Sequence, residues 1–264
     1  MASTDNAPSP STPLFSVAAG VATITLNRPA HRNRLEDDDL HALLRLFAEV
    51  DADTQIRVLQ ITANTQGQPR PVFCAGYHLG GFDGADHDPH LFERIPDTLS
   101  RLRPVTVCAL NGSVYGGATD LVLACDLRMG LEGTEFRMPA TALGLHYYPS
   151  GLQRFVARLG ISGAKRAFLT ARPFSADQLL RMGCLEAVST AQDFEAEVAR
   201  LVGEIASLAP LAAQEAKRSL NEIAGGLIDL PALQARQALT AQSQDFAEGR
   251  LAFAEKRQPV FTGK

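Results

Sequence analysis

The stretch Asn111–Asp126, NGSVYGGATDLVLACD, places paired glycines between an apolar strand and an apolar helix. The strand is expected over Pro104–Leu110 and the helix over Ala118–Cys125. Glycine at such a junction lets the main chain approach a ligand closely, and N–H groups in the first helical turn lack acceptors within the helix. Asp120 lies in that turn, where it either stabilises the helix end or reaches a ligand held by the N–H groups.

A second glycine-rich turn follows another strand. The segment Arg70–Phe82, RPVFCAGYHLGGF, comes after an apolar strand expected over Arg57–Thr62, and it also contains paired glycines. Two such turns can place two main-chain N–H groups around one oxygen atom. Preorganised donors of this kind stabilise negative charge that develops on a carbonyl oxygen.

Together, FCAGYHL (residues 73–79) and NGSVYGGATDLVLACDLRM (residues 111–129) resemble the paired oxyanion signatures of the enoyl-CoA hydratase/isomerase, or crotonase, family. The resemblance extends from Val21 to the C-terminus. It implies an α/β crotonase fold in which ββα units wind into a spiral core at residues 13–205. A helical C-terminal oligomerisation region would follow at residues 206–264, and the family's assembly implies a homotrimer or a hexamer made of two trimers.

The resemblance also implies an acyl-CoA thioester substrate and gives roles to single residues. The N–H groups of Tyr77 and Gly117 would form the oxyanion hole, and Asp120 takes the position of the first of two glutamates that serve hydratases. Asp120 is therefore the main acid/base candidate, although its shorter side chain sets the carboxylate about one methylene further back. Coenzyme A would enter as part of the substrate, and no permanently bound cofactor is expected. Contacts with coenzyme A are implied for Arg34, Ala75, Leu79 and Lys256. Lys256 and Arg257 would meet its phosphates, within one subunit or across a subunit interface, or else form a solvated helix end where the dipole favours cations.

Some residues depart from the family pattern. Ala140 stands where the second catalytic glutamate is usual, and His78 stands where an aspartate usually follows the oxyanion donor. Syn-hydration normally uses both acids, so we expect weak or altered hydration, and a single-carboxylate isomerase fits the sequence better. His146 is a candidate for the missing proton transfer because an imidazole exchanges protons near neutral pH. A histidine in a hydrogen-bonded pocket or a trimer contact is the alternative interpretation.

Other functions stay open at this point. Dehalogenation and decarboxylation also occur on this scaffold, and fold alone does not decide the chemistry. The alternative from another class is a noncatalytic acyl-CoA-binding or scaffold protein, which the alanine at position 140 favours. Retention of Asp120 beside both oxyanion elements favours an enzyme.

Composition argues against several further classes. The 264 residues carry a net charge of −4 without a run of Lys or Arg, which argues against nucleic-acid binding. The four cysteines form no C-x-x-C pair and are expected to be reduced core residues. His78, His87 and His90 lack the spacing of a metal site. We found no Walker loop, G-x-G-x-x-G fingerprint or G-x-S-x-G elbow.

The first segment, Met1–Thr12, is rich in Ser, Pro, Asp and Asn and lacks the basic start and apolar run of an export signal. We expect it to be a disordered lead-in. No apolar segment approaches the roughly 20 residues of a membrane span. The sequence therefore predicts a cytoplasmic protein.

Local patterns predict the remaining elements. Val21–Leu26 alternates with period two and pairs with Leu14–Ala18 across Gly20. Ser175–Gly183 begins with a serine cap and has Gln178 three residues later, which is typical of a capped helix. Further helices are expected at Glu36–Asp51, near Leu91–Leu102, from Ser150 to Gly160, at Lys165–Thr170, Phe194–Ala209 and Pro210–Gly225, and near Leu230–Ser243 and Asp245–Glu255, with a strand at Cys184–Val188.

Overall fold

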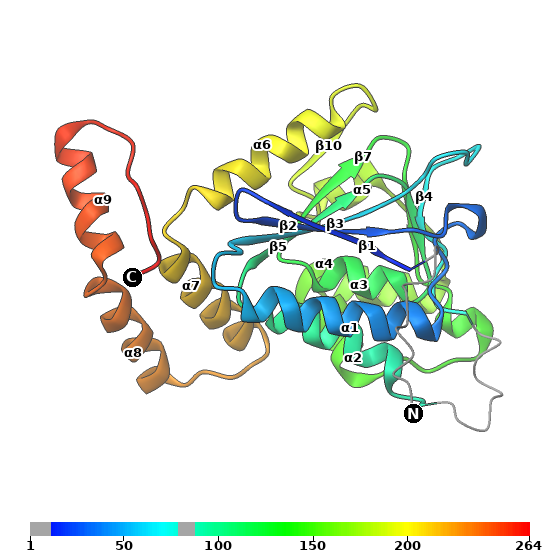
Figure 1. The fold of residues 1–264 in the computed structure, drawn as a ribbon. Coiled ribbons are helices and arrows are strands. Elements are labelled where there is room, and N and C mark those ends of the chain that lie inside the picture. The colour runs from blue at the N-terminus through cyan, green and yellow to red at the C-terminus, as the bar shows by residue number, and fades with distance from the viewer. Residues whose placement is uncertain (1–11, 79–87) are drawn as a thin grey trace, which may run out of the picture.

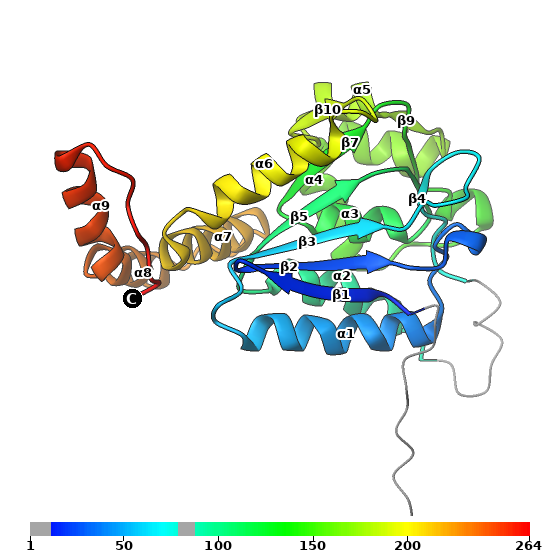
Figure 2. The ribbon, with the colours of Figure 1, turned by 45° about the horizontal axis from the view of Figure 1, so that its top comes forward.

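The computed structural model describes residues 12–78 and 88–264. The expected lead-in up to residue 11 lies outside these residues, as do Leu79, His87 and most of the loop at 80–89. The described chain forms two sheets with helices packed around them (Figures 1 and 2).

The predicted strand–turn–strand at the beginning is confirmed. Strand β1 (Leu14–Ala18) pairs antiparallel with β2 (Val21–Leu26), and Ala18 faces Val21 across a two-residue turn. Ala19 and Gly20 both have positive φ, as the tight turns of β-hairpins require. Alternate residues of β2 are buried, because one face of the strand lies on the core.

A ββα unit recurs along the chain and builds both sheets. In each unit the first strand joins a large sheet of order β1-β2-β3-β5-β7-β10, and the second joins a small sheet of order β4-β6-β8-β9. Neighbouring first strands are parallel, as are β4, β6 and β8. The carboxyl ends of the large-sheet strands therefore lead into the small sheet on one side of the molecule (Figure 2). The units are β3 (Val58–Ala63), β4 (Val72–Cys74) and α2 (Leu91–Arg101); β5 (Val105–Leu110), β6 (Ser113–Tyr115) and α3 (Ala118–Ala124); and β7 (Leu127–Leu131), β8 (Glu135–Arg137) and α4 (Pro149–Thr170).

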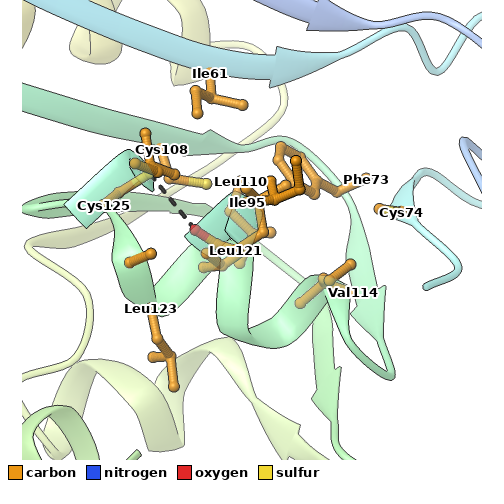
Figure 3. Packing of buried hydrophobic residues seen from close by; sticks show 14 of the residues in the cluster. Ile61, Phe73, Cys74, Ile95, Cys108, Leu110, Val114, Leu121, Leu123 and Cys125 are labelled. Carbon is orange, nitrogen blue, oxygen red and sulfur yellow. Dashed lines mark hydrogen bonds between the residues drawn. The ribbon is translucent and has the colours of Figure 1, made fainter. Parts of the chain in front are cut away.

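Helices cover both faces of the large sheet. On one face α1 (Asp37–Ala52), α2 and α3 bury a continuous apolar cluster that includes Phe47 and Leu121. On the other face α6 (Phe194–Ala206) packs against β3, β5 and β7 through a second cluster. Figure 3 shows the first cluster where Cys108 of β5 meets Cys125 at the end of α3. All four cysteines are free and buried, as the sequence predicted.

The helices after β8 differ in detail from the prediction. The two helices expected before and after residue 160 are confirmed: they are the two parts of α4, which meet at Gly160, where the non-helical φ of +66° and ψ of 166° break the helix. The capping box of Ser175 and Gln178 is confirmed at the start of α5 (Ala176–Arg181). The following strand, β10 (Ala187–Ser189), begins three residues later than expected. The short elements η1 (Pro29–His31), η3 (Ala140–Leu143) and β9 (Phe174–Ser175) complete this part.

The C-terminal helices begin with one that is tied to the sheet. Lys217 of α7 (Pro210–Ala224) is buried, donates to the carbonyl of Pro104 at 2.7 Å and pairs with Asp126 at 2.8 Å. Helices α8 (Leu230–Ala241) and α9 (Gln244–Glu255) instead extend away from the two sheets in both views (Figures 1 and 2).

The last residues fold back and fasten α9 to the body. The carboxylate of Asp245 accepts hydrogen bonds from the N–H groups of Thr262 and Gly263, at 2.7 and 2.8 Å. Arg57, just before β3, donates to the carbonyl oxygens of Phe261 at 2.7 Å and Ala206 at 3.1 Å. We refer to these contacts of Arg57 as the Arg57 clasp.

Candidate active site

The backbone around Tyr77 is held by the loop that follows β2. The N–H of Leu35 donates to the carbonyl of Gly76, and the N–H of His78 donates to the carbonyl of Leu35, each at 2.9 Å. The Tyr77 hydroxyl donates to Asp37 at 2.5 Å, at the start of α1. Burial, together with the neighbouring Asp37 carboxylate, raises the pKa of Tyr77, so this phenol stays neutral. Tyr77 is therefore fixed both through its main chain and through its side chain.

Two of the residues expected to contact coenzyme A lie beside this turn. The N–H of Ala75 donates to the carbonyl of Arg32 at 2.9 Å, and Ala75 is exposed. The guanidinium of Arg34 donates to Glu36 at 2.7 Å, while its Nε is buried without a partner. Lys256 is exposed and directly follows α9, and this helix lies at the opposite end of the molecule from β4 in both views (Figures 1 and 2).

The two glycine-rich turns pack directly against each other, as the sequence led us to expect. A Cβ atom added to Gly76 would lie 2.9 Å from the carbonyl oxygen of Tyr115 and 3.6 Å from the Cα of Gly116. Both glycines have positive φ, at +101° and +60°. Only glycine combines this conformation with such a close approach. Tyr77 and Gly117 are the residues that directly follow these two packed glycines.

Gly117 opens α3 beneath an aromatic ring. A Cβ on Gly117 would lie 2.6 Å from Cζ of Phe92, so the ring covers the Cα of this glycine. The Phe92 ring stacks on Tyr77 at 5.5 Å between centroids and approaches Tyr148 at 6.4 Å. Within residues 12–78 and 88–264, no main-chain acceptor takes the N–H of Gly117. These rings thus form an apolar wall beside the two turns.

Asp120 is fully buried, and both of its oxygens are engaged. Arg154 of α4 donates from Nε to Oδ1 at 2.8 Å and from Nη2 to Oδ2 at 2.7 Å. The same guanidinium contacts Asp97 of α2 at 2.6 Å. Burial alone would lower the pKa of Arg154, but the hydrogen bond and charge of Asp120 outweigh it and raise the pKa. This bidentate geometry is the strong form of a carboxylate–guanidinium pair.

A phenol also reaches the Asp120 carboxylate. The hydroxyl of Tyr148 donates to Oδ2 at 2.5 Å, and the hydroxyl of Tyr147 donates to that of Tyr148 at 3.0 Å. Burial is the main cause that raises the pKa of each phenol, and the negative charge of Asp120 adds to it. Both tyrosines are therefore neutral hydrogen-bond donors next to a carboxylate.

Comparison with known proteins identifies the family. The profile described as Enoyl-CoA hydratase/isomerase matches residues 16–264. The chain belongs to the enoyl-CoA hydratase/isomerase family. Among its relatives in this family is the 2,3-dehydroadipyl-CoA hydratase of Escherichia coli (strain K12), 32% identical over 92% of this chain and 96% of the relative. Another is the mitochondrial enoyl-CoA hydratase domain-containing protein 2 of Mus musculus, 33% identical over 93% and 85% of the two chains.

Solved structures of the enoyl-CoA hydratase/isomerase family share this fold. The enoyl-CoA hydratase of Bacillus anthracis superposes with a TM-score of 0.84 and 28% identity, over 96% of this chain and all of that chain. Pseudomonas aeruginosa DspI gives a TM-score of 0.86 and 27% identity over 98% and 100%. The predicted crotonase fold, with ββα units and C-terminal helices, is confirmed.

In this member of the enoyl-CoA hydratase/isomerase family, positions 140 and 146, which were considered from the sequence for a second proton-transfer group, differ in character. Ala140 is buried at the start of η3 and supplies no carboxylate. His146 is exposed, and no hydrogen bond joins it to Asp120 among the described residues. Its neighbours in sequence, the two tyrosines, occupy the place beside Asp120 instead.

Arg154, Tyr148 and Phe92 are the site residues that sequence reasoning missed. Arg154 adjoins the buried stripe of Gly151 and Phe155 on α4. An arginine in such a position needs a buried acid, and this was the signal available in the sequence. The rings of Phe92 and Tyr148 gave no comparable signal, because an aromatic residue at helical spacing or at a helix start is usually part of the core.

Among residues 12–78 and 88–264, no group of three or more His, Cys, Asp or Glu side chains is arranged to hold a metal ion. In the same part of the chain, no helix combines the length and the apolar character that crossing a membrane requires.

Proposed function

We propose that this protein transforms acyl-CoA thioesters through an enolate, with the N–H groups of Tyr77 and Gly117 holding the thioester oxygen. The observation that carries the proposal is the packing of Gly76 against Tyr115 and Gly116, which brings the two turns together. Negative charge on the oxygen would be stabilised by donors already in place, and losing one such donor typically costs about 100–1000-fold in rate.

Asp120 is the proposed acid/base group, with its carboxylate in the first turn of the helix that Gly117 opens. Hydration needs one group to activate water and another to protonate carbon. Ala140 removes the usual second group, which supports movement of a double bond by one shuttled proton over hydration. His146 is the sequence-derived candidate for a second group, and the same assay tests it.

Coenzyme A would be bound only as part of the substrate, without a permanent cofactor. Arg34 and Ala75 flank the Tyr77 turn, and this position supports contacts with the pantetheine and phosphate end of coenzyme A. Leu79 is the third residue proposed to make such contacts. Lys256 would reach coenzyme A only from another subunit, since α9 lies far from this turn in its own chain.

For the C-terminal helices, we propose that residues 206–264 join subunits into a homotrimer or a hexamer. Helices α8 and α9 extend from the body and leave large apolar side chains in water; Phe253 is 87% exposed. Large patches of exposed apolar surface mark interaction sites. The large apolar side chains that are exposed in this region are Leu208, Leu220, Ile223, Leu227, Ile228, Leu230, Leu239, Phe246, Leu251, Phe253 and Val260.

A panel of thioesters tests the proposed function. Purified protein is incubated with crotonyl-, longer 2-enoyl-, 3-enoyl- and aryl-CoA, and product masses, enoyl absorbance and thermal stabilisation are recorded together. Double-bond movement that is abolished by Asp120→Asn supports the proposal. The variant His146→Phe tests whether the imidazole also takes part in proton transfer. Thermal stabilisation by CoA esters without product would favour the binding-only alternative. If the protein showed no stabilisation and formed no product, the proposal would be refuted.

A further inference from the structure

The carboxylate of Asp120 is poorly placed to touch a substrate itself. Its side chain is fully buried, Arg154 occupies both oxygens, and the Tyr148 hydroxyl takes a second position on Oδ2. An aspartate is also one methylene shorter than the glutamate usual at this position. The hydroxyl oxygen of Tyr148 is hydrogen-bonded directly to this carboxylate.

Tyr148 stands between Asp120 and the wall of the two turns. Its ring is partly exposed and lies 6.4 Å from the ring of Phe92, which itself covers the Cα of Gly117 and stacks on Tyr77. The same phenol therefore contacts the buried carboxylate at one end and the aromatic residues of the proposed acyl site along its face. The hydroxyl of Tyr147 donates to it and fixes its orientation.

The ion pairs around Asp120 carry one uncompensated negative charge, which one proton would neutralise. Arg154 is shared between two carboxylates, at 2.7 Å from the buried Asp120 and 2.6 Å from the partly buried Asp97, so this group of three has a net charge of −1 when all are ionised. Arg101 also approaches Asp97, at 3.6 Å, but its side chain is 77% exposed and its charge is screened by water. A proton arriving at Asp120 would bring the group to neutrality.

We propose that the Tyr148 hydroxyl is the group that exchanges a proton with the substrate carbon, as a relay to Asp120; this inference rests on the proposed function. In the forward step the Cα–H bond breaks and its electron pair enters the enolate held by Tyr77 and Gly117. The substrate proton passes to Oη of Tyr148 while the proton of Tyr148 moves to Oδ2 of Asp120. In the second step Oη gives a proton to the γ-carbon and recovers one from Asp120.

This relay avoids charging the phenol at any stage. Burial, Tyr147 and the Asp120 carboxylate raise the pKa of Tyr148, so a free phenolate beside Asp120 is disfavoured. A coupled transfer, in which one proton arrives as the other leaves, keeps the oxygen of Tyr148 neutral. The negative charge moves only between Asp120 and the enolate, where Arg154 and the two main-chain N–H groups stabilise it.

The test uses the thioester that the wild-type protein converts fastest in the panel. Positioned proton transfer typically contributes about 100–10 000-fold, so Tyr148→Phe is expected to lower kcat by that factor while KM changes less than threefold. Tyr115→Phe makes the same chemical change at a phenol whose hydroxyl bonds to Glu135 on β8, and it should lower kcat far less than Tyr148→Phe does. A Tyr148→Phe protein with more than a third of wild-type kcat would overturn the inference.

A double variant separates a relay from two independent groups. If Tyr148 and Asp120 act in series, Tyr148→Phe combined with Asp120→Asn should be no slower than the slower single variant. Losses that multiply would overturn the relay and show that Asp120 reaches the substrate by itself. A wild-type protein that converts no thioester refutes the proposed function, whereas conversion insensitive to Tyr148 refutes only this inference.

A second measurement keeps the proposal testable if Tyr148→Phe fails to fold. Replacing Tyr148 by 3,5-difluorotyrosine keeps the hydroxyl and the ring but makes the phenol more acidic. If the hydroxyl oxygen of Tyr148 both accepts and gives the transferred proton, this replacement should change kcat by more than threefold from the wild-type value. The same replacement at Tyr115 is the control, and equal kcat for both fluorinated proteins would overturn the inference.

Discussion

The contact between Gly117 and Phe92 makes a quantitative prediction for Gly117→Ala. The backbone of Gly117 is helical, with φ −55° and ψ −31°, so alanine is allowed there and by itself would stabilise the protein by about 0.4–1 kcal/mol. The new Cβ, however, would lie 2.6 Å from Cζ and 2.8 Å from Cε1 of Phe92. Carbon atoms in good contact are about 3.5–4.0 Å apart, so the ring must move by about 1 Å.

The clash with Phe92 costs more than the replacement of glycine gains, so Gly117→Ala should destabilise the protein. Overpacking of this kind costs about 1–3 kcal/mol, so Gly117→Ala should lower the free energy of unfolding by about 1–2 kcal/mol. In a Phe92→Leu background the clashing ring atoms are gone, and the same alanine should be neutral or stabilising. The double-mutant cycle should therefore give a coupling energy of about 2 kcal/mol.

Urea denaturation at one fixed protein concentration measures these values, because assembly would make stability depend on concentration. Gly203→Ala is the matched control, since Gly203 lies within α6 with nothing within 4 Å of its added Cβ. This control should gain about 0.5–1 kcal/mol. An equal effect of Gly117→Ala in both Phe92 backgrounds would refute the contact. In the thioester assay, Gly117→Ala should also lower kcat by about 100-fold if the displaced N–H serves the oxyanion.

Three further predictions follow from charge and burial. Arg154→Met should cost about 3–5 kcal/mol of unfolding free energy, because it leaves the buried Asp120 charge unpaired; a calorimetric loss below 1 kcal/mol would contradict the pairing. Hydrogen bonds from Arg257 lower the pKa of Glu248 to about 2, so their contribution to stability is present above about pH 4.3 and is lost as the pH falls through about 2. NMR titration should give this midpoint, and Arg257→Met should return it toward the ordinary value. Burial raises the pKa of Cys74 to about 12, so iodoacetamide at pH 8 should label this thiol only after denaturation.

Elements governed by local patterns could be predicted from the sequence. The alternation of Val21–Leu26 and the capping box of Ser175 and Gln178 depend on residues a few positions apart, and both are confirmed. The paired glycines also had a local meaning, since only glycine allows the close approach seen between Gly76 and Gly116.

Features that depend on contacts between distant segments could not be predicted in the same way. Asp120 and Arg154 are 34 residues apart, and their ion pair forms only when α3 and α4 pack together. The three-residue strands β6 and β8 are too short for a periodicity to show. The contact of Tyr148 with Asp120 depends on the path of the chain between η3 and α4, which no local pattern reports.

The Arg57 clasp has a consequence for the order in which the chain folds. It joins Arg57 to Phe261 across 204 positions in sequence, and a loop of that length costs more entropy to close than a shorter one. Contacts between neighbouring units such as β3 and β5 span far shorter loops, so we expect them to form first. The clasp and the docking of α9 then come last, and the surface that exposes Phe253 is presented only once the sheets exist. Subunits that use this surface would therefore meet as folded units.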